Sequence, residues 1–308
     1  MSAPACVMLT TRGELPLGGR MRLMGIVNAT PDSFSDAGLE RSLAARVELA
    51  RMQLAAGADV IDIGGESGVT NRPAVAVREE IERVVPVIER VVAELGATVS
   101  VDTYKPEVAR AAIAAGAAIV NDVSALRDPE LADVCAQTGA GLILMHTRAA
   151  PKVKLLDRSY DGRIVADVRD LLAGLIELAC RRGVAYEQIM LDPGPDFAKT
   201  PSQTIESMRA LGDLHQFGRP ILLAVSRKDF IGALTGRAPS ERLAGTLAAL
   251  GHGISAGAHM VRIHDVGAAD DYIRVHAALS GEADVDPGLT LQESLRREPP
   301  VRVVGDSR

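Results

Sequence analysis

Eight short apolar runs, each followed by a polar or glycine-containing turn and then by an amphipathic stretch, restrict most strongly how this chain can fold. The runs are Leu23–Val27, Val60–Ile63, Thr98–Val101, Ile119–Val120, Leu142–Met145, Ile189–Leu191, Ile221–Val225 and Met260–Ile263. Most are continuously apolar rather than alternating, which is typical of parallel strands that helices cover on the outside.

Helical patterns separate these runs. They include Leu43–Ala56, Val77–Leu95, Pro106–Ala115, Ile164–Arg182, Pro201–Phe217 and Arg242–Ala256. Pro106 and Pro201 suit the first turn of a helix, and glycines follow several of the segments, where they favour a helix end. The alternation predicts an α/β protein with a (β/α)8 TIM barrel as the leading architecture. A doubly wound open sheet is the alternative.

The length and composition agree with one large core. The chain has 308 residues, of which 47% are hydrophobic, and α/β barrels of this size commonly form a single domain. We expect residues 1–20 to be an irregular lead-in or a small strand cap, and residues 21–280 to form the barrel. The charged tail at 281–308 is expected to lie outside the core.

Charge and cysteine content narrow the classes of partner. A net charge of −6 and a pI near 5.6 argue against a nucleic-acid groove, which needs a basic face. No apolar run reaches the ~18 residues of a membrane span, and the first residues lack the pattern of a signal peptide. Cys6, Cys135 and Cys180 are widely spaced and odd in number, which favours a reducing compartment. We therefore predict a cytoplasmic protein that acts on small molecules.

Polar residues follow every predicted strand. They are Asn28, Asp62, Asp102, Asn121 with Asp122, His146, Asp192, Ser226–Lys228, and Arg262 with His264. Any one of them could be a turn former or a helix N-cap. In a barrel, however, the carboxyl ends of all strands meet on the face where active sites form. The repetition at eight strand ends therefore indicates a binding face.

The chemistry of these residues divides into two sectors. Asp102, Asn121 and Asp192 can hydrogen-bond a heterocycle that carries several N–H groups, such as an aminopyrimidinone. Lys228, Arg262 and His264 form a cationic sector near the strand 7–8 region, which is a common phosphate site in barrels. A heterocycle bearing a phosphate or diphosphate fits both sectors. Simple Arg–Asp charge neutralisation across the mouth is the alternative explanation.

Metal binding is expected only in a limited form. His146 and His264 do not predict a zinc site, because no third nitrogen or sulfur ligand has a suitable spacing. Asn28 together with Asp32 or Asp36 could hold Mg²⁺ through water and diphosphate oxygens, which is how that ion usually binds.

At these residues the sequence resembles the dihydropteroate synthase family, over roughly residues 20–280. The matching blocks are MGIVNATPDSFSDAG (Met24–Gly38), DIGGES (Asp62–Ser67), VDTYKPEVA (Val101–Ala109), IVNDVS (Ile119–Ser124), LMH (Leu144–His146), LDPG (Leu191–Gly194), SRK (Ser226–Lys228) and RIHDV (Arg262–Val266). Each block alone is a weak signal, but their common order and spacing make a strong one.

The resemblance implies a transferase of folate biosynthesis, usually a homodimeric TIM barrel. Such an enzyme joins 6-hydroxymethyl-7,8-dihydropterin diphosphate to 4-aminobenzoate and releases diphosphate. The protein need not supply a nucleophile, because charge neutralisation at the leaving group and positioning of the amine carry the reaction.

The resemblance also implies roles for individual residues. The pterin contacts would be Asp102, Asn121, Met145, Asp192, Phe197 and Lys228. The diphosphate contacts would be Asn28, Arg262 and His264, with Mg²⁺ near Asn28. The catalytic set would be Asn28, Asp102, Lys228, Arg262 and His264. Replacing Arg262 with alanine is then expected to weaken diphosphate binding and to spare the free pterin.

The sequence departs from the family pattern mainly where the aryl amine should bind. After the second strand it reads GGESGVTNRPAV instead of GGESTRPG, so that Thr70 and Arg72 arrive late. Asp229 stands where a serine usually helps to hold the aminobenzoate carboxylate, and it would repel that group by ~0.5–1 kcal/mol. We assign the aryl amine site to Thr70, Arg72 and Asp229. Ala224, Asp196 and Ala198 are further departures.

These departures keep other functions open. The chain could be a divergent paralogue that binds the pterin diphosphate but has weak or no synthase activity, or uses another amine. It could also be a non-catalytic pterin-binding protein. A methyltetrahydrofolate-binding methyltransferase domain would not need the SRK and RIHDV elements. Alternatively, the altered loop re-forms the usual site and Asp229 points elsewhere.

Overall fold

The computed structural model describes residues 3–29, 36–66 and 73–297. Within these ranges, eight parallel strands lie in the order β8-β7-β6-β5-β4-β3-β10-β9. Leu191 pairs with Ile221, and its N–H donates to the Pro220 carbonyl at 2.8 Å, which joins the two ends of this order. The TIM-barrel prediction is confirmed, and the open-sheet alternative is wrong.

All eight predicted strands are present. They are β3 (Arg22–Asn28), β4 (Val60–Gly64), β5 (Thr98–Asp102), β6 (Ile119–Asp122), β7 (Gly141–Met145), β8 (Ile189–Asp192), β9 (Leu222–Leu223) and β10 (Met260–Ile263). Only β9 is much shorter than the predicted Ile221–Val225. Its pairing with β8 is limited to the single bridge at Ile221, next to a proline that has no N–H to donate.

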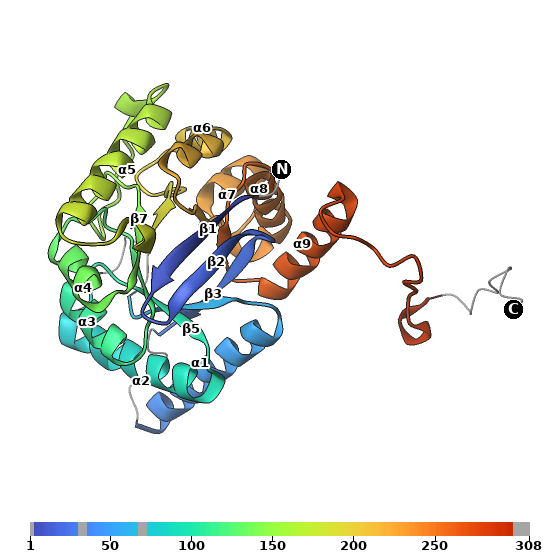
Figure 1. Ribbon diagram of the computed structural model, residues 1–308, viewed down its shortest axis with the longest axis horizontal. Coiled ribbons are helices and arrows are strands. Elements are labelled where there is room, and N and C mark those ends of the chain that lie inside the picture. Colours follow the sequence, from blue (N-terminus) through green and yellow to red (C-terminus); the bar gives the residue numbers. More distant parts are fainter. Residues whose placement is uncertain (1–2, 30–35, 67–72, 298–308) are drawn as a thin grey trace, which may run out of the picture.

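Helices alternate with the strands around the outside of the barrel (Figure 1). They are α1 (Asp36–Ala55), α2 (Val77–Leu95), α3 (Pro106–Ala114), α4 (Glu130–Thr138), α5 (Ile164–Arg181), α6 (Pro201–Arg209), α7 (Asp229–Thr235), α8 (Leu243–Ser255) and α9 (Val266–Ser280). The predicted helix Pro201–Phe217 is in fact α6 followed by a 3-10 segment at Leu211–Phe217. Helices α4, α7 and α9 were not among the predicted segments, and α4 and α7 span only 9 and 7 residues.

Alternation along the strands decides which side chains enter the barrel. One apolar cluster fills the interior at the amino ends of the strands, and includes Met24, Val60, Ile119, Ile143, Met190, Leu222 and Met260. Their strand neighbours, such as Leu23, Ile61 and Val261, pack outwards against the helices. Because the side-chain period is two, the inward positions further along the strands fall on polar residues. These include Asp62, Asn121, Asp192 and Arg262.

A β-hairpin covers the amino-terminal end of the barrel. Strands β1 (Ala3–Thr10) and β2 (Gly13–Gly19) pair antiparallel and cross the front of the barrel in Figure 1. Met8 and Leu17 of the hairpin pack into the interior cluster. The hairpin therefore fills one end with apolar side chains and leaves the carboxyl end of the strands for polar ones.

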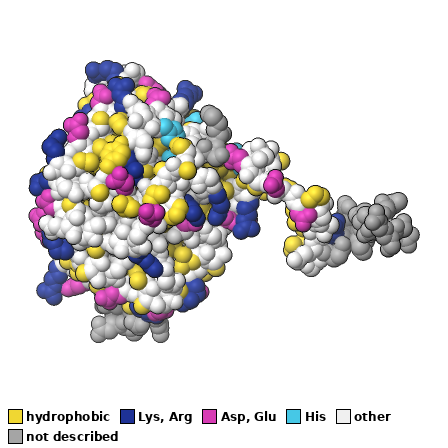
Figure 2. All heavy atoms as spheres, in the orientation of Figure 1, with side chains coloured by type: hydrophobic (Ala, Val, Ile, Leu, Met, Phe, Trp, Pro, Cys, Tyr) yellow, Lys and Arg dark blue, Asp and Glu magenta, His cyan; other side chains and the backbone are white. Residues whose placement is uncertain are grey.

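The described part of the carboxyl-terminal tail, residues 281–297, leads away from the barrel after α9 (Figure 1). Its apolar side chains Val285, Leu289 and Leu291 are exposed. On the face seen in Figure 2, Lys and Arg side chains are interspersed with Asp and Glu. In the part of the chain that the structure describes, no helix is both long and apolar enough to cross a membrane.

Candidate active site

The register of neighbouring strands aligns three of the polar strand ends. Asn28 pairs with Gly64, Gly64 with Asp102, and Asp102 with Asn121. On the other side of the barrel, Met145 pairs with Asp192. Side chains that are far apart in the sequence therefore line the same mouth.

Arg262 connects two carboxylates across this mouth. Its Nε donates to Asp62 Oδ2 at 2.6 Å, and its Nη2 donates to Asp102 Oδ2 at 2.8 Å. Burial by itself would lower the pKa of Arg262, but the charges of Asp62 and Asp102 outweigh it and raise that pKa above the usual value. The guanidinium thus stays charged and belongs to both sectors of the site, and the Arg–Asp pairing that the alternative explanation describes is present.

Asp62 is a site residue that the sequence assignment of roles omitted. Its side chain is fully buried, and Asn121 Nδ2 also donates to its Oδ2, at 3.3 Å. Its other oxygen, Oδ1, is buried without a hydrogen-bond partner among the described residues. Its inward position, two residues after Val60 in β4, was the signal that could have identified it.

Asp102 is the titratable group of the mouth whose protonation matters most at neutral pH. Loss of solvent raises the pKa of Asp102 to about 7, against the charge of Arg262 and with the help of Asp62. A carboxylate with this pKa changes its charge near neutral pH.

We expect the affinity for an oxidised pterin to fall as the pH is lowered through about 7, because protonated Asp102 loses the negative charge that accepts N–H groups. Below that pKa the loss approaches about tenfold per pH unit. Fluorescence titration between pH 5.5 and 8.5 measures it, and Asp102→Asn should remove the dependence. An affinity independent of pH in the wild type would contradict this assignment.

Asp192, Met145, Phe197 and Lys228 lie together on the opposite side of the mouth from Arg262's partners. Asp192 Oδ1 accepts the Gly194 N–H at 2.7 Å, and burial raises the pKa of Asp192. Lys228 Nζ lies 4.2 Å from the centre of the Phe197 ring, a cation–π distance. Met145 is fully buried beside them. The structure thus brings four of the six predicted pterin contacts together, and Asp102 and Asn121 lie across the mouth from them.

His264 lies at the edge of the mouth next to Ser226. Its backbone N–H donates to Ser226 Oγ at 3.1 Å, and its Nδ1 is 2.8 Å from the same oxygen. Loss of solvent around the ring, together with the charges of Arg227 and Arg262, lowers the pKa of His264 to about 4, although part of the residue stays exposed. In the free protein His264 therefore offers a hydrogen bond, and the positive charge of the predicted cationic sector comes from Lys228 and Arg262.

His146 lies behind the mouth rather than in it. It is fully buried, and its Nε2 is 2.9 Å from Asp167 Oδ2 while its Nδ1 is 2.7 Å from Lys199 Nζ. Burial lowers the pKa of His146 to about 2, so the ring is neutral at pH 7. Lys199 also donates to the Gly194 carbonyl at 2.9 Å. These two residues support the loop that carries Phe197.

Asp229, one of the three residues assigned to the aryl amine, lies exposed at the start of α7. Its side chain is 87% exposed and accepts a hydrogen bond from Arg242 Nη1 at 2.9 Å. Arg242 also donates to the Arg227 carbonyl, which fixes its direction. Thr70 and Arg72, the other two residues assigned to the aryl amine, lie outside the described residues.

Asn28 is the only described side chain of the predicted magnesium site. It ends β3 with its side chain exposed, while the next N–H, of Ala29, donates to the Gly64 carbonyl at 2.7 Å. The described ranges contain no group of three or more His, Cys, Asp or Glu that could hold a metal ion. One amide oxygen fits Mg²⁺ if substrate phosphates and water supply the remaining ligands. Asp32 lies outside the described residues, as does the side chain of Asp36.

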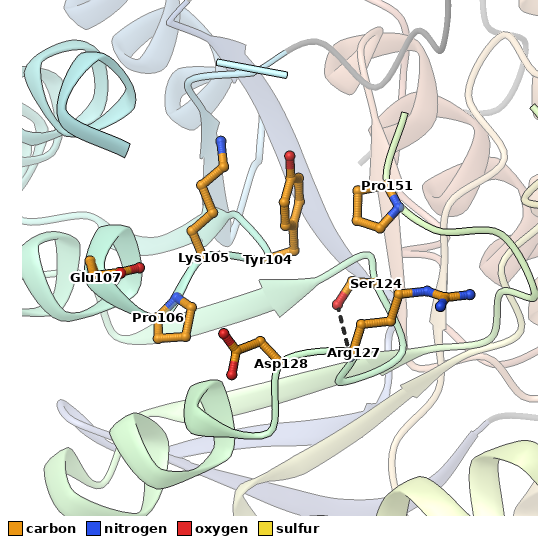
Figure 3. A pocket seen from close by; sticks show the side chains of 8 residues that line it. All are labelled: Tyr104, Lys105, Pro106, Glu107, Ser124, Arg127, Asp128 and Pro151. Carbon is orange, nitrogen blue, oxygen red and sulfur yellow. Dashed lines mark hydrogen bonds between the residues drawn. The ribbon is translucent and has the colours of Figure 1, made fainter. Parts of the chain in front are cut away.

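A cavity of about 400 Å³ lies beside the site and contains none of the predicted residues (Figure 3). It is lined by Tyr104, Lys105, Pro106, Glu107, Ser124, Arg127, Asp128 and Pro151. Its cations are already engaged: Lys105 donates to Glu66 Oε2 at 2.9 Å, and Arg127 donates to the Arg148 carbonyl at 2.9 Å. We therefore assign the chemistry to the barrel mouth.

Comparison with known proteins shows the family to which the chain belongs. Residues 24–264 match the sequence model of the family described as pterin binding enzyme. A dihydropteroate synthase from Synechocystis is 42% identical over 264 residues, which cover 85% of this chain and 91% of that protein. A solved structure of Xanthomonas albilineans dihydropteroate synthase with 4-aminobenzoic acid superposes with a TM-score of 0.79 at 42% identity, covering 87% of this chain and 95% of the other.

One relative carries a different description. A Mycobacterium bovis protein named inactive dihydropteroate synthase 2 is 40% identical over 279 residues, which cover 88% of this chain and 87% of that protein. Overall similarity therefore does not separate active from inactive relatives, and the residues of the site must do so.

Proposed function

Because the chain belongs to the pterin-binding enzyme family and is similar over most of its length to dihydropteroate synthases, we propose that it is a synthase that couples 6-hydroxymethyl-7,8-dihydropterin diphosphate to 4-aminobenzoate and releases diphosphate. The observation that carries the proposal is the meeting of acceptors for a heterocycle with two cations at one barrel mouth: Asp102, Asn121, Asp192, Lys228 and Arg262. A cytoplasmic location and a homodimer stay predictions.

The carboxylates of the mouth support recognition of the pterin. Asp102 and Asp192 accept ring N–H and exocyclic amine donors, and Asn121 supplies both a donor and an acceptor. The buried Asp62 Oδ1 supports the same ligand, because a buried acceptor without a partner costs roughly 1–3 kcal/mol that a pterin N–H would recover. Phe197, under Lys228, forms an apolar wall for the ring.

The cations support departure of the diphosphate. The bond between the pterin methylene carbon and the diphosphate oxygen breaks, and both electrons leave with the oxygen. Arg262 and Lys228 stabilise the charge that develops there. The amine nitrogen of 4-aminobenzoate then forms a bond to the methylene carbon and loses a proton. Mg²⁺, held by Asn28 and the diphosphate oxygens, would supply further charge neutralisation.

The test is a coupled product assay. The purified full chain is incubated with the pterin diphosphate, Mg²⁺ and 4-aminobenzoate, and dihydropteroate and released diphosphate are measured together. We expect both products in equal amounts. Pterin binding without either product would refute the synthase proposal and identify a binding paralogue.

A second function has specific support. In this function the chain binds pterins without synthase activity; the name of the Mycobacterium bovis relative describes that protein as inactive. Two departures from the family pattern favour this function. Thr70 and Arg72 stand further along the loop after the second strand than in that pattern, and Asp229 replaces a serine. A different aryl amine in the same assay separates altered substrate choice from lack of activity.

Asp229→Ser is expected to change the KM for 4-aminobenzoate by less than about twofold, because Arg242 already neutralises the exposed carboxylate and exposed ion pairs contribute little. Steady-state kinetics at saturating pterin diphosphate measure it. A fall in KM of about fivefold or more, the effect of ~1 kcal/mol, would mean that Asp229 repels the substrate carboxylate after all.

A further inference from the structure

The loop between β8 and α6 has an unusual backbone. Gly194, Asp196 and Ala198 all adopt left-handed conformations, with φ of 63°, 66° and 51°. Glycine adopts this region freely, whereas other residues do so at a cost that aspartate and asparagine bear best. Residues held in such conformations by their surroundings cluster at functional sites. The contacts of the Asp196 side chain with α6 and α7 hold it in this conformation.

The side chain of Asp196 joins three elements of the barrel. Its Oδ1 accepts a hydrogen bond from Thr204 Oγ1 in α6 at 3.2 Å. The backbone N–H of Asp196 donates to the same Thr204 Oγ1 at 3.1 Å. Its Oδ2 accepts the N–H of Phe230 in α7 at 3.2 Å. That N–H lies in the first turn of α7, where it has no acceptor within the helix, and the N-cap Lys228 makes no side-chain capping bond.

Two proposed pterin contacts lie directly beside these bonds. Phe197 is the residue after Asp196, and Lys228 is the N-cap of α7. Lys228 Nζ lies 4.2 Å from the centre of the Phe197 ring. The two side chains therefore contact each other between the β8–α6 loop and α7, the two segments that Asp196 links. Burial lowers the pKa of Lys228, and the charge of Asp196 opposes that shift, followed by Asp192.

We propose that Asp196 is a positioning residue that caps α7 from the β8–α6 loop and thereby holds Phe197 and Lys228 at the spacing that binds the pterin. This inference rests on the proposed function, since it concerns the same pterin site. It adds a residue that the resemblance marks only as a departure from the family pattern. Asp196 acts through Phe197 and Lys228 and does not itself contact the reacting atoms.

The test compares Asp196→Gly with Asp196→Asn in the full chain. Glycine adopts the left-handed backbone without strain but removes both accepted bonds, so we expect KM for the pterin diphosphate to rise about tenfold with kcat changed less than about twofold. Asparagine keeps one accepting oxygen and tolerates the backbone, so it should rescue KM to within about threefold of the wild type. Binding of 6-hydroxymethylpterin, measured by calorimetry, should follow the same order.

Asp128→Gly is the matched control. Asp128 Oδ1 accepts the N–H of Glu130 at the start of α4, at 3.0 Å, in another loop of the barrel. This variant should lower the melting temperature and leave both KM and 6-hydroxymethylpterin binding unchanged. If Asp196→Gly also changes only the melting temperature, or if asparagine restores nothing, Asp196 is merely structural and the proposal is overturned.

The binding measurement separates this inference from the proposed function. If the wild type binds 6-hydroxymethylpterin but makes no dihydropteroate, the synthase proposal fails, and the binding order of the Asp196 variants still decides the positioning role. If the wild type binds neither 6-hydroxymethylpterin nor the pterin diphosphate, both are overturned.

Discussion

Replacing Arg262 with alanine is expected to lower kcat/KM by about 10²–10³-fold, the usual loss when a group that stabilises developing charge is removed. The structure indicates that the affinity for the pterin itself would also fall. Arg262 is the partner of both Asp62 and Asp102, and without it these two carboxylates face each other in a poorly solvated mouth. Breaking a buried pair by removing one partner is strongly unfavourable.

This expectation differs from the one that the sequence supports, in which the free pterin would still bind. We expect 6-hydroxymethylpterin binding to weaken together with diphosphate binding, as measured by calorimetry beside steady-state kinetics. Arg22→Ala is the control, because Arg22 pairs with Asp59 at 2.8 Å near the amino end of β3, far along the strand from the mouth. It should leave kcat/KM unchanged. Unaltered pterin binding in Arg262→Ala would show that the two sectors are independent.

Replacing Gly194 with alanine is expected to reduce kcat/KM by at least about a hundredfold and to lower the melting temperature. Gly194 has φ of 63°, and an added Cβ would lie 2.1 Å from the His146 carbonyl oxygen. A backbone oxygen cannot rotate away as a flexible side chain can, so the loop itself must move. Phe197 and the Asp192 carboxylate, which accepts the Gly194 N–H, would move with it.

Gly139→Ala separates this clash from the cost of the backbone conformation. Gly139 ends α4 with φ of 74°, and no atom lies within 4 Å of the Cβ position. In both variants alanine must adopt a left-handed backbone, which lowers the free energy of unfolding by about 1 kcal/mol. Thermal unfolding measures this loss. Only Gly194→Ala should lose pterin affinity. A normal KM for the pterin diphosphate in that variant would refute the role of this loop.

The architecture could be predicted from the sequence because local patterns specify it. Continuous apolar runs such as Leu142–Met145 form buried parallel strands, and the helix Val77–Leu95 has the predicted bounds. Helix α7 escaped prediction because its 7 residues span only about two turns, too few for a periodic pattern. The break after Arg209 escaped it because the apolar pattern continues through the 3-10 segment.

The members of the site could also be predicted, for a topological reason. Polar residues that end parallel strands meet at one face, whatever the details of packing, and so Asp102, Asn121 and Asp192 were identified together. Asp62 was recognised as one of the polar strand ends but was given no role, because the sequence did not reveal that the inward alternation of β4 directs it towards Arg262 and Asn121.

What the sequence by itself determined is therefore the strand–helix order, the barrel and the composition of its polar mouth. Only the tertiary structure decided the partners: Arg262 with Asp62 and Asp102, Asp229 with Arg242, and Asp196 with the start of α7. The physical reason is distance along the chain. Arg262 contacts carboxylates 200 and 160 residues away, and no local pattern records which charges face each other once the barrel closes.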